Sequence, residues 1–313
     1  MATHTIHLIT HDACLRHNMG DAHPESAARL EAIYKELATS PLSLRWHTAR
    51  KIGENLLLQA HAKEHIERIK AVAPSQEYYF LGPDVTMNPA TLDAARYAAG
   101  SIIDAVDLVY RQKTEPVFCL VRPPGHHAEY HQAMGFCFFN NLACGVLYAL
   151  NRYEATRVAI VDFDVHHGNG TQDILKNHSN VLFCSSFQHP FYPFSPVITD
   201  HPTIIHLPLS AGTRGNEYRQ RFEDTFLSRL QDYNPDILFV SAGFDAHHLD
   251  PIGGLNLAED DYFWLGETLA RLANTCCNGR IISTLEGGYH LRALANSTHS
   301  YLTGISQACQ HIV

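Results

Sequence analysis

Aspartate and histidine residues with the spacing of metal ligands follow an apolar run in VAIVDFDVHHGNG, residues 158–170. Asp164 and His166 are two residues apart, so at an extended strand end both side chains point the same way and can ligate one ion. Asp162 shares that face, and Asp245 closes a second apolar run. Two carboxylates and one imidazole leave a position for water or substrate, which is typical of catalytic zinc. Without Asp245, an ordinary buried Asp–His pair would be the simpler interpretation.

Two further clusters carry residues suited to proton transfer. His126 and His127 follow Pro-Pro-Gly, and adjacent imidazoles beside a metal can take a proton from activated water and support the developing charge. Gly288 and Tyr289 end another apolar run, where glycine permits close backbone approach and the tyrosine hydroxyl can donate to an oxyanion. By themselves, a His-His dipeptide and a turn tyrosine are ordinary loop residues. The second pair, at 247–248, is given no catalytic role.

All these residues stand at the ends of expected strands. Short apolar runs rich in Val, Ile and Phe alternate with helical patterns, which predicts an α/β fold with a parallel sheet covered on both faces. We expect strands at 3–11, 117–121, 157–164, 180–187, 203–209, 236–245 and 280–289, and helices at 27–39, 91–111, 140–152, 217–233 and 259–274. Ligands bind beyond the carboxyl ends of such strands. Five of these ends carry the densest His, Asp and Gly content, which predicts one site.

Composition limits the classes of function. The 313 residues, 45% of them hydrophobic, fit one large domain over 1–313. The net charge of −9 argues against direct binding of nucleic acid. No apolar run approaches the roughly 20 residues of a membrane span, and the N-terminus lacks a signal-peptide pattern. We therefore expect a cytoplasmic protein without a membrane partner, and the sequence leaves open whether it forms an oligomer.

With these residues assembled, the sequence resembles the zinc-dependent histone deacetylase family. The resemblance runs from His23 to Tyr289 and rests on RPPGHHA, DFDVHHGNGT, GFDAHHLDPIGGL and EGGY. It implies a single domain with the open arginase/deacetylase fold, whose centre is an eight-stranded parallel sheet. Asn169 stands where class I members carry aspartate, so the sequence is similar to class II.

The resemblance also implies roles for particular residues. Tyr192 stands where the human enzymes commonly have phenylalanine, and Ile252 stands where polyamine-specific relatives can carry glutamate. The implied site comprises one Zn²⁺ per chain on Asp164, His166 and Asp245; the catalytic His126, His127 and Tyr289; a structural K⁺ at Asp162 and Ser185 with the carbonyls of Asp164 and His166; and the substrate-binding Gly135, Phe136, Tyr192, Ile252 and Gly288.

The two tandem histidines are expected to differ in charge. Asn169 can accept a hydrogen bond from His127 without adding negative charge, whereas Asp162 can partner His126 and raise its pKa. We therefore expect His127 to be the neutral general base and His126 to act electrostatically.

The expected activity is zinc-dependent hydrolysis of acetyl-lysine, or of a similar N-acyl amine, to free amine and acetate. The partner is then an acylated lysine of a protein or a small N-acyl amine. One alternative is an acetylpolyamine amidohydrolase, which Ile252 disfavours; another is an arginase-like binuclear manganese hydrolase, which needs more carboxylates. A non-catalytic acyl-lysine-binding module is a third. Asp84, in FLGPDVT, is a further residue that can hold a substrate backbone at the rim.

Overall fold

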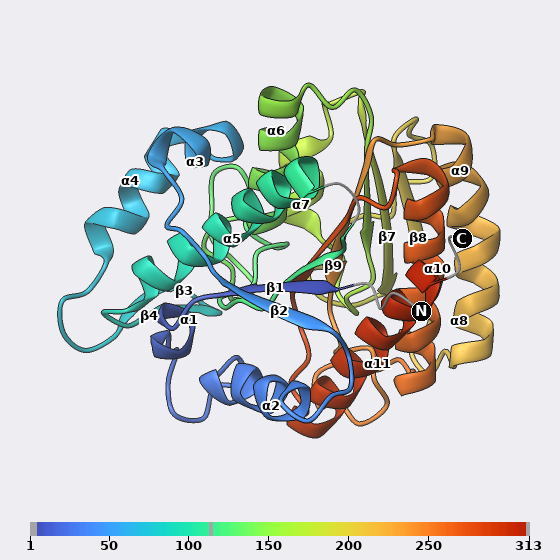
Figure 1. Cartoon of the computed structure of the whole chain (residues 1–313). Helices are drawn as coiled ribbons and strands as arrows, with labels where there is room; N and C mark the ends of the chain where they lie inside the picture. The colour runs from blue at the N-terminus through green and yellow to red at the C-terminus, as the bar shows by residue number, and fades with distance from the viewer. Residues whose placement is uncertain (1–4, 113–114, 311–313) are drawn as a thin grey trace.

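A single parallel sheet forms the centre of the computed structural model, which describes residues 5–112 and 115–310 (Figure 1). Its strands lie in the order β2-β1-β5-β10-β9-β6-β7-β8, and each neighbouring pair is parallel. They are β1 (Ile6–Thr10), β2 (Leu44–Thr48), β5 (Val117–Cys119), β6 (Val158–Asp162), β7 (Val181–Gln188), β8 (Ile204–Leu209), β9 (Ile237–Ala242) and β10 (Ile281–Leu285). Separately, β3 (Tyr79–Gly82) and β4 (Val85–Met87) form an antiparallel hairpin. The expected open eight-stranded sheet is confirmed.

Helices cover both faces of this sheet (Figure 1). On one face, α5 (Thr91–Gln112) packs against β1, β5 and β10 and against α6 (Asn141–Tyr153). On the other, α11 (Leu291–Gln310) packs against both α2 (Ala27–Leu37) and α10 (Glu259–Cys276). The shorter helices are α1 (Ala13–Arg16), α3 (Glu54–Ala60), α4 (Lys63–Val72), α7 (Asn169–Leu175), α8 (Gly215–Phe222) and α9 (Ser228–Tyr233), with the π-helical turn η1 (Glu223–Leu227) joining the last two. Within the described residues, no helix combines the length and apolar character that crossing a bilayer requires.

Burial explains which strands and helices were predicted from the sequence and which were missed. Every residue of β6, β9 and β10 is buried, because a helix-covered parallel sheet has no solvent face, and these strands are therefore mostly apolar, without a regular alternation of polar residues. The edge strand β2, with the sequence LRWHT, has no fully buried residue and was not predicted. Helix α11 was also missed, since its Ser and Thr residues have low helix propensity although Ser297 and Thr298 are buried.

Several strands end earlier than expected, and this places the polar motifs in loops. β6 ends at Asp162, β9 at Ala242 and β10 at Leu285, so the clusters that follow them lie beyond the sheet edge. The first strand is described from Ile6, and residues 1–4, 113–114 and 311–313 of the expected domain, with the first two residues of the strand expected at 3–11, lie outside the described residues.

Candidate active site

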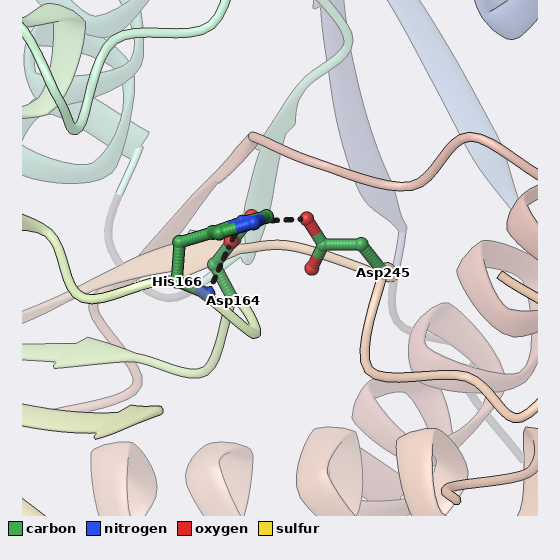
Figure 2. A group of neighbouring side chains, drawn as sticks. All are labelled: Asp164, His166 and Asp245. Atoms are coloured by element: carbon green, nitrogen blue, oxygen red, sulfur yellow. Dashed lines mark hydrogen bonds and ion pairs between the residues drawn. The ribbon is translucent and has the colours of Figure 1, made fainter. Parts of the chain in front are cut away.

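Asp164, His166 and Asp245 converge at the carboxyl edge of the sheet (Figure 2). One potential ligand atom of each lies within 4.8 Å of the others. His166 Nδ1 is 3.0 Å from Asp164 Oδ1 and 3.2 Å from Asp245 Oδ2, and all three residues are buried. Two buried carboxylates that face one imidazole carry a charge that needs compensation. Their donor atoms are those that zinc accepts, so the residues fit a divalent cation.

A turn after β6, rather than an extended strand, brings Asp164 and His166 together. Residues 164–166 form a bend. Within it, Asp164 Oδ1 accepts the backbone N–H of His166 at 2.9 Å, and Asp162 Oδ1 accepts the N–H of Asp164 at 3.1 Å. The two side chains do face the same point, but the expected cause was wrong, because a turn and not the alternation of an extended strand brings them together. Aspartate side chains that bond the backbone two residues onward fold the segment so that both ligands face the same point.

Contacts between loops place Asp245 against this turn. Asp245 Oδ1 accepts the N–H of Val165 at 2.9 Å, while Oδ2 is buried and makes no hydrogen bond of good geometry with any described residue. Gly287 donates its N–H to Asp164 Oδ2 at 2.8 Å. A Cβ at Gly287 would lie 2.0 Å from Asp245 Oδ2, so only glycine fits there. A buried carboxylate oxygen without a hydrogen-bond partner is what a bound cation would satisfy.

The electrostatics of the cluster also favour a cation. Burial and the charge of Asp164 raise the pKa of Asp245 to about 7. Although burial opposes ionisation, the charge of His126 and the hydrogen bond from His166 hold the pKa of Asp164 below its usual range. Burial likewise opposes charge on His166, yet its hydrogen bond to Asp164 and the nearby carboxylate of Asp245 raise its pKa to about 9. The carboxylates thus stabilise positive charge between them.

The tandem histidines lie next to the cluster and have different partners, as expected. His126 Nδ1 is 3.0 Å from Asp162 Oδ2, and His127 Nδ1 is 2.7 Å from Asn169 Oδ1. Burial opposes charge on both imidazoles, but the neighbouring carboxylates, Asp164 first, raise the pKa of His126 to about 10. Burial lowers the pKa of His127 well below its usual range, and the positive charge of His126 adds to that effect. The site therefore pairs one charged imidazole with one neutral imidazole.

Two acidic residues that the sequence analysis did not single out hold this pair in place. Glu129 Oε1 accepts from Asn169 Nδ2 at 2.7 Å, which orients the amide oxygen toward His127. Glu286 is fully buried, and its Oε2 accepts the backbone N–H groups of Gly125 and His126 at 2.7 and 3.1 Å. No spacing marks Glu129 in the sequence, whereas Glu286 stands in the EGGY motif, which was its one signal.

Tyr289 lies on the loop after β10 and packs against the site. Its ring meets the ring of Phe136 edge-on at 6.0 Å, and the guanidinium of Arg29 lies 4.9 Å from its centroid. Arg29 Nε donates to the carbonyl of Gly288 at 2.6 Å, a contact that the sequence did not suggest. Gly288 has φ +123°, which favours glycine. Burial raises the pKa of Tyr289 well above its usual value, so the hydroxyl keeps its proton.

Aromatic side chains converge on the tandem histidines and the ligand imidazole. The Tyr192 ring lies edge-on to His127 at 5.1 Å and to His166 at 5.9 Å. Phe191 stacks on His166 at 5.2 Å. Gly135 has φ +56°, and a Cβ on it would lie 2.3 Å from His127 Cδ2. The backbone therefore passes so close to the general-base candidate that a side chain at position 135 would displace it.

Ser185 and Ile252 are connected to the site through hydrogen bonds and strand pairing with other residues. Ser185 pairs with Asp162 across β7 and β6, and its hydroxyl lies 2.9 Å from His167 Nδ1. The N–H of Ile252 donates to Asp250 Oδ1 at 3.0 Å, and Asp250 Oδ2 accepts the N–H of Tyr289 at 2.6 Å. Asp250 thus links the Ile252 loop to Tyr289.

The fold and the site together define a class of α/β protein in which a buried Asp-His-Asp cluster, with donor atoms that fit a metal ion, stands at the carboxyl edge of a parallel sheet. Comparison with known families makes the assignment more specific. The sequence model of the histone deacetylase domain matches residues 23–305, most of the chain. The chain belongs to the histone deacetylase family.

Individual relatives agree with this assignment. An uncharacterized protein of Synechocystis sp. is 40% identical over 291 residues, covering 90% of this chain and 93% of that protein. Histone deacetylase 14, chloroplastic, of Arabidopsis thaliana is 34% identical over 91% of this chain and 73% of its own length. The crystal structure of the HDA15 HD domain matches with a TM-score of 0.91 and 32% identity, covering 98% of this chain and 89% of that one. The resemblance stated from the sequence is confirmed, and these relationships make the chain a hydrolase of the deacetylase type.

Proposed function

We propose that the chain is a zinc-dependent deacylase that hydrolyses the amide of acetyl-lysine, or of a similar N-acyl amine, to the free amine and acetate. One observation carries the proposal: the buried Asp164, His166 and Asp245 stand beside two imidazoles whose pKa values are shifted in opposite directions. Groups with pKa values driven apart are typical of sites that divide acid and base roles. Family membership supports the amide as the bond that is broken.

The cluster fits one Zn²⁺ per chain. When bound, zinc polarises the acyl carbonyl and lowers the pKa of water. Asp164, His166 and Asp245 would hold the ion, because their donor atoms lie within 4.8 Å of one another and Asp245 Oδ2 has no hydrogen-bond partner among the described residues. Three protein ligands leave a position for water and substrate, as catalysis requires.

His127 is suited to act as the general base. Its Nδ1 faces the amide oxygen of Asn169, so Nδ1 carries the proton and Nε2 of the neutral ring is available to accept one from the attacking water. Glu129 keeps the amide from rotating, since it accepts from Asn169 Nδ2. His126, which is paired with Asp162, is suited to stabilise negative charge that develops in the site. The Tyr289 hydroxyl donates to the oxyanion of the tetrahedral intermediate.

The substrate's alkyl chain would lie between the aromatic walls. Phe136 and Tyr192 form these walls, Gly135 offers its carbonyl to the acylated N–H, and Ile252 and Gly288 complete the enclosure. The contacts of Phe136 with Tyr289 and of Tyr192 with His127 support this arrangement. A structural K⁺ at Asp162 and Ser185 is supported by the pairing of these two residues across neighbouring strands.

The proposal is tested with a fluorogenic acetyl-lysine assay on protein stripped of metal and reconstituted with Zn²⁺. We expect turnover that depends on zinc and is blocked by a hydroxamate. Asp245→Asn, which removes one ligand charge without changing shape, should abolish both zinc retention and turnover. His248→Asn changes an exposed histidine of the same loop and should keep both. Absence of turnover at full zinc occupancy, or full activity of the Asp245 variant, would contradict the proposal.

A further inference from the structure

A groove of about 530 Å³ opens beside the aromatic wall of the candidate site. Its walls come from helix α4, from the β3–β4 hairpin and from the loop after the tandem histidines, on the left of Figure 1. Tyr192 lines the groove and also packs edge-on against His127 in the site. The groove is therefore continuous with the surface where an acylated amine would enter, and its volume is that of a typical ligand pocket.

Arg68 is the only cationic residue among the described residues that line this groove. Burial lowers the pKa of the neighbouring His65, and the positive charge of Arg68 adds to that effect, so this imidazole stays neutral. On the same helix, Lys70 pairs with Glu54 at 2.7 Å. Arg68 is exposed and forms no ion pair or hydrogen bond with any residue that the structure describes, so its guanidinium is available to a ligand.

Much of the remaining surface of the groove is apolar. Leu81, Pro83, Ala133 and Met134 contribute to it. A side chain that fits such a surface has a hydrocarbon stem, and one that also pairs with Arg68 ends in an anion. Glutamate has both features, and its stem is longer than that of aspartate.

Asp84 is the acidic residue of the lining, and it is occupied by contacts within the protein. Its Oδ2 accepts the N–H of Gly135 at 2.9 Å and the hydroxyl of Tyr192 at 2.8 Å, and it forms no ion pair with Arg68. These two hydrogen bonds hold the Asp84 carboxylate at the end of the groove that adjoins the aromatic wall. A carboxylate of the occupant would therefore lie toward α4, where it meets Arg68 and avoids the charge of Asp84.

Two exposed aromatic side chains next to the groove favour a polypeptide as the occupant. Phe80, which precedes Leu81 in β3, is 76% exposed, and Phe194, two residues after Tyr192, is 75% exposed. Aromatic residues and arginine are the side chains that contribute most to binding at protein and peptide interfaces. A polypeptide that carries an acyl-lysine extends over the surface around the site and can cover these side chains.

We infer that this groove is a specificity subsite that binds the side chain of a glutamate near the acyl-lysine of a polypeptide substrate, with Arg68 pairing with its carboxylate. The inference rests on the proposed function and deepens it, because it names one feature of the substrate. The net charge of −9 repels an acidic peptide at long range. A preference for glutamate must therefore come from contact in the groove, and it must depend on Arg68.

The test measures kcat/KM of the zinc-loaded enzyme for acetyl-lysine peptides that differ at a single position. One glutamate is moved through the positions on either side of the acetyl-lysine, and each glutamate peptide is compared with the peptide that has lysine there. We expect glutamate to be preferred about fivefold at the position that reaches the groove, mainly through KM, as for a partly exposed ion pair. In Arg68→Glu the preference at that position should reverse, so that the lysine peptide becomes the better substrate.

Two further variants make the result specific. Arg68→Gln removes the charge alone and should bring the two peptides close to equal, and it provides a second route to the answer if Arg68→Glu does not fold. Lys35→Glu makes the same change in net charge at an exposed lysine of α2, outside the groove, and should keep the wild-type preference. A preference that reverses when the enzyme's charge is reversed cannot arise from a general loss of stability, which affects both peptides alike.

The possible failures are distinguishable. If the wild type hydrolyses the peptides but glutamate and lysine stay within twofold at every position, or if Arg68→Glu leaves the preference unchanged, the subsite is refuted and the proposed function stands. Acetyl-lysine with a free α-carboxylate, compared with its amide, checks the occupant. If Arg68→Glu changes that ratio as it changes the peptide ratio, Arg68 binds the substrate's own carboxylate and the assignment to a glutamate side chain is wrong. If the zinc-loaded wild type hydrolyses none of these substrates, the proposed function fails and this inference fails with it.

Discussion

Substitution of aspartate for Asn169 tests whether His127 is the general base. The amide of Asn169 faces His127 with its oxygen at 2.7 Å and faces Glu129 with its nitrogen at 2.7 Å. In the single variant Asn169→Asp, a carboxylate oxygen of residue 169 would lie against the carboxylate of Glu129. One of these two carboxyl groups would then have to take up a proton. The informative variant is therefore Asn169→Asp combined with Glu129→Gln, whose amide can donate to the new carboxylate.

The expected shift follows from the distance between the charges. The hydrogen bond of 2.7 Å places the new carboxylate beside the imidazole. With charge centres about 4 Å apart and an effective dielectric constant of about 20, the ion pair is worth about 4 kcal/mol. That corresponds to about 3 pKa units as an upper limit, since burial of the new charge opposes the effect. We expect the pKa of His127 to rise by about 1 to 3 units.

The assay is the pH dependence of kcat/KM for an acetyl-lysine substrate. A general base must be unprotonated in the free enzyme, so kcat/KM falls as the pH drops through the pKa of the base. A raised pKa moves this acidic limb to higher pH by the same 1 to 3 units, with Glu129→Gln alone as the matched control. An acidic limb that stays where the control has it, in a variant that still folds and binds zinc, would refute the role of His127.

Three further predictions concern other parts of the chain. Tyr289→Phe should lower kcat by about two orders of magnitude or more, as removal of one oxyanion donor does, and near-normal turnover would contradict that role. Metal analysis of the active enzyme should find one zinc per chain, and zinc at 100 times its Kd should stabilise the stripped protein by about 2.7 kcal/mol in urea unfolding; two manganese ions would contradict this. His61 is buried, its Nδ1 donates to the carbonyl of Glu129, and its Nε2 accepts the N–H of Asn140. Burial lowers the pKa of His61 to about 3. The unfolded chain takes up the proton below about pH 6.5 and the folded chain does not, so His61 should cost about 2 kcal/mol of stability between pH 7 and 5. His61→Gln should remove that part of the pH dependence, and an unchanged difference between urea unfolding at the two pH values would show that His61 is not its source.

Much of the fold was predictable because burial leaves a pattern in the chain. The strands β6, β9 and β10 are buried on both faces, so each is mostly apolar and can be recognised from its own segment of the sequence. Edge strand β2 lacks that signal, because solvent covers part of it and its residues are of mixed polarity. The resemblance to the deacetylase family supplied the eighth strand of the sheet, which the pattern of LRWHT did not reveal.

The sequence by itself determined which residues have the chemistry, since Asp164, His166 and Asp245 can be named from their types and their places after apolar runs. Only the tertiary structure decided how side chains from different loops meet. Glu129 orients an amide 40 positions away, and the hydroxyl of Tyr192 reaches a carboxylate 108 positions away. Periodicity reports the environment of one segment at a time. A hydrogen bond between loops depends on distances of tenths of an ångström, which are set when the sheet and its helices pack together.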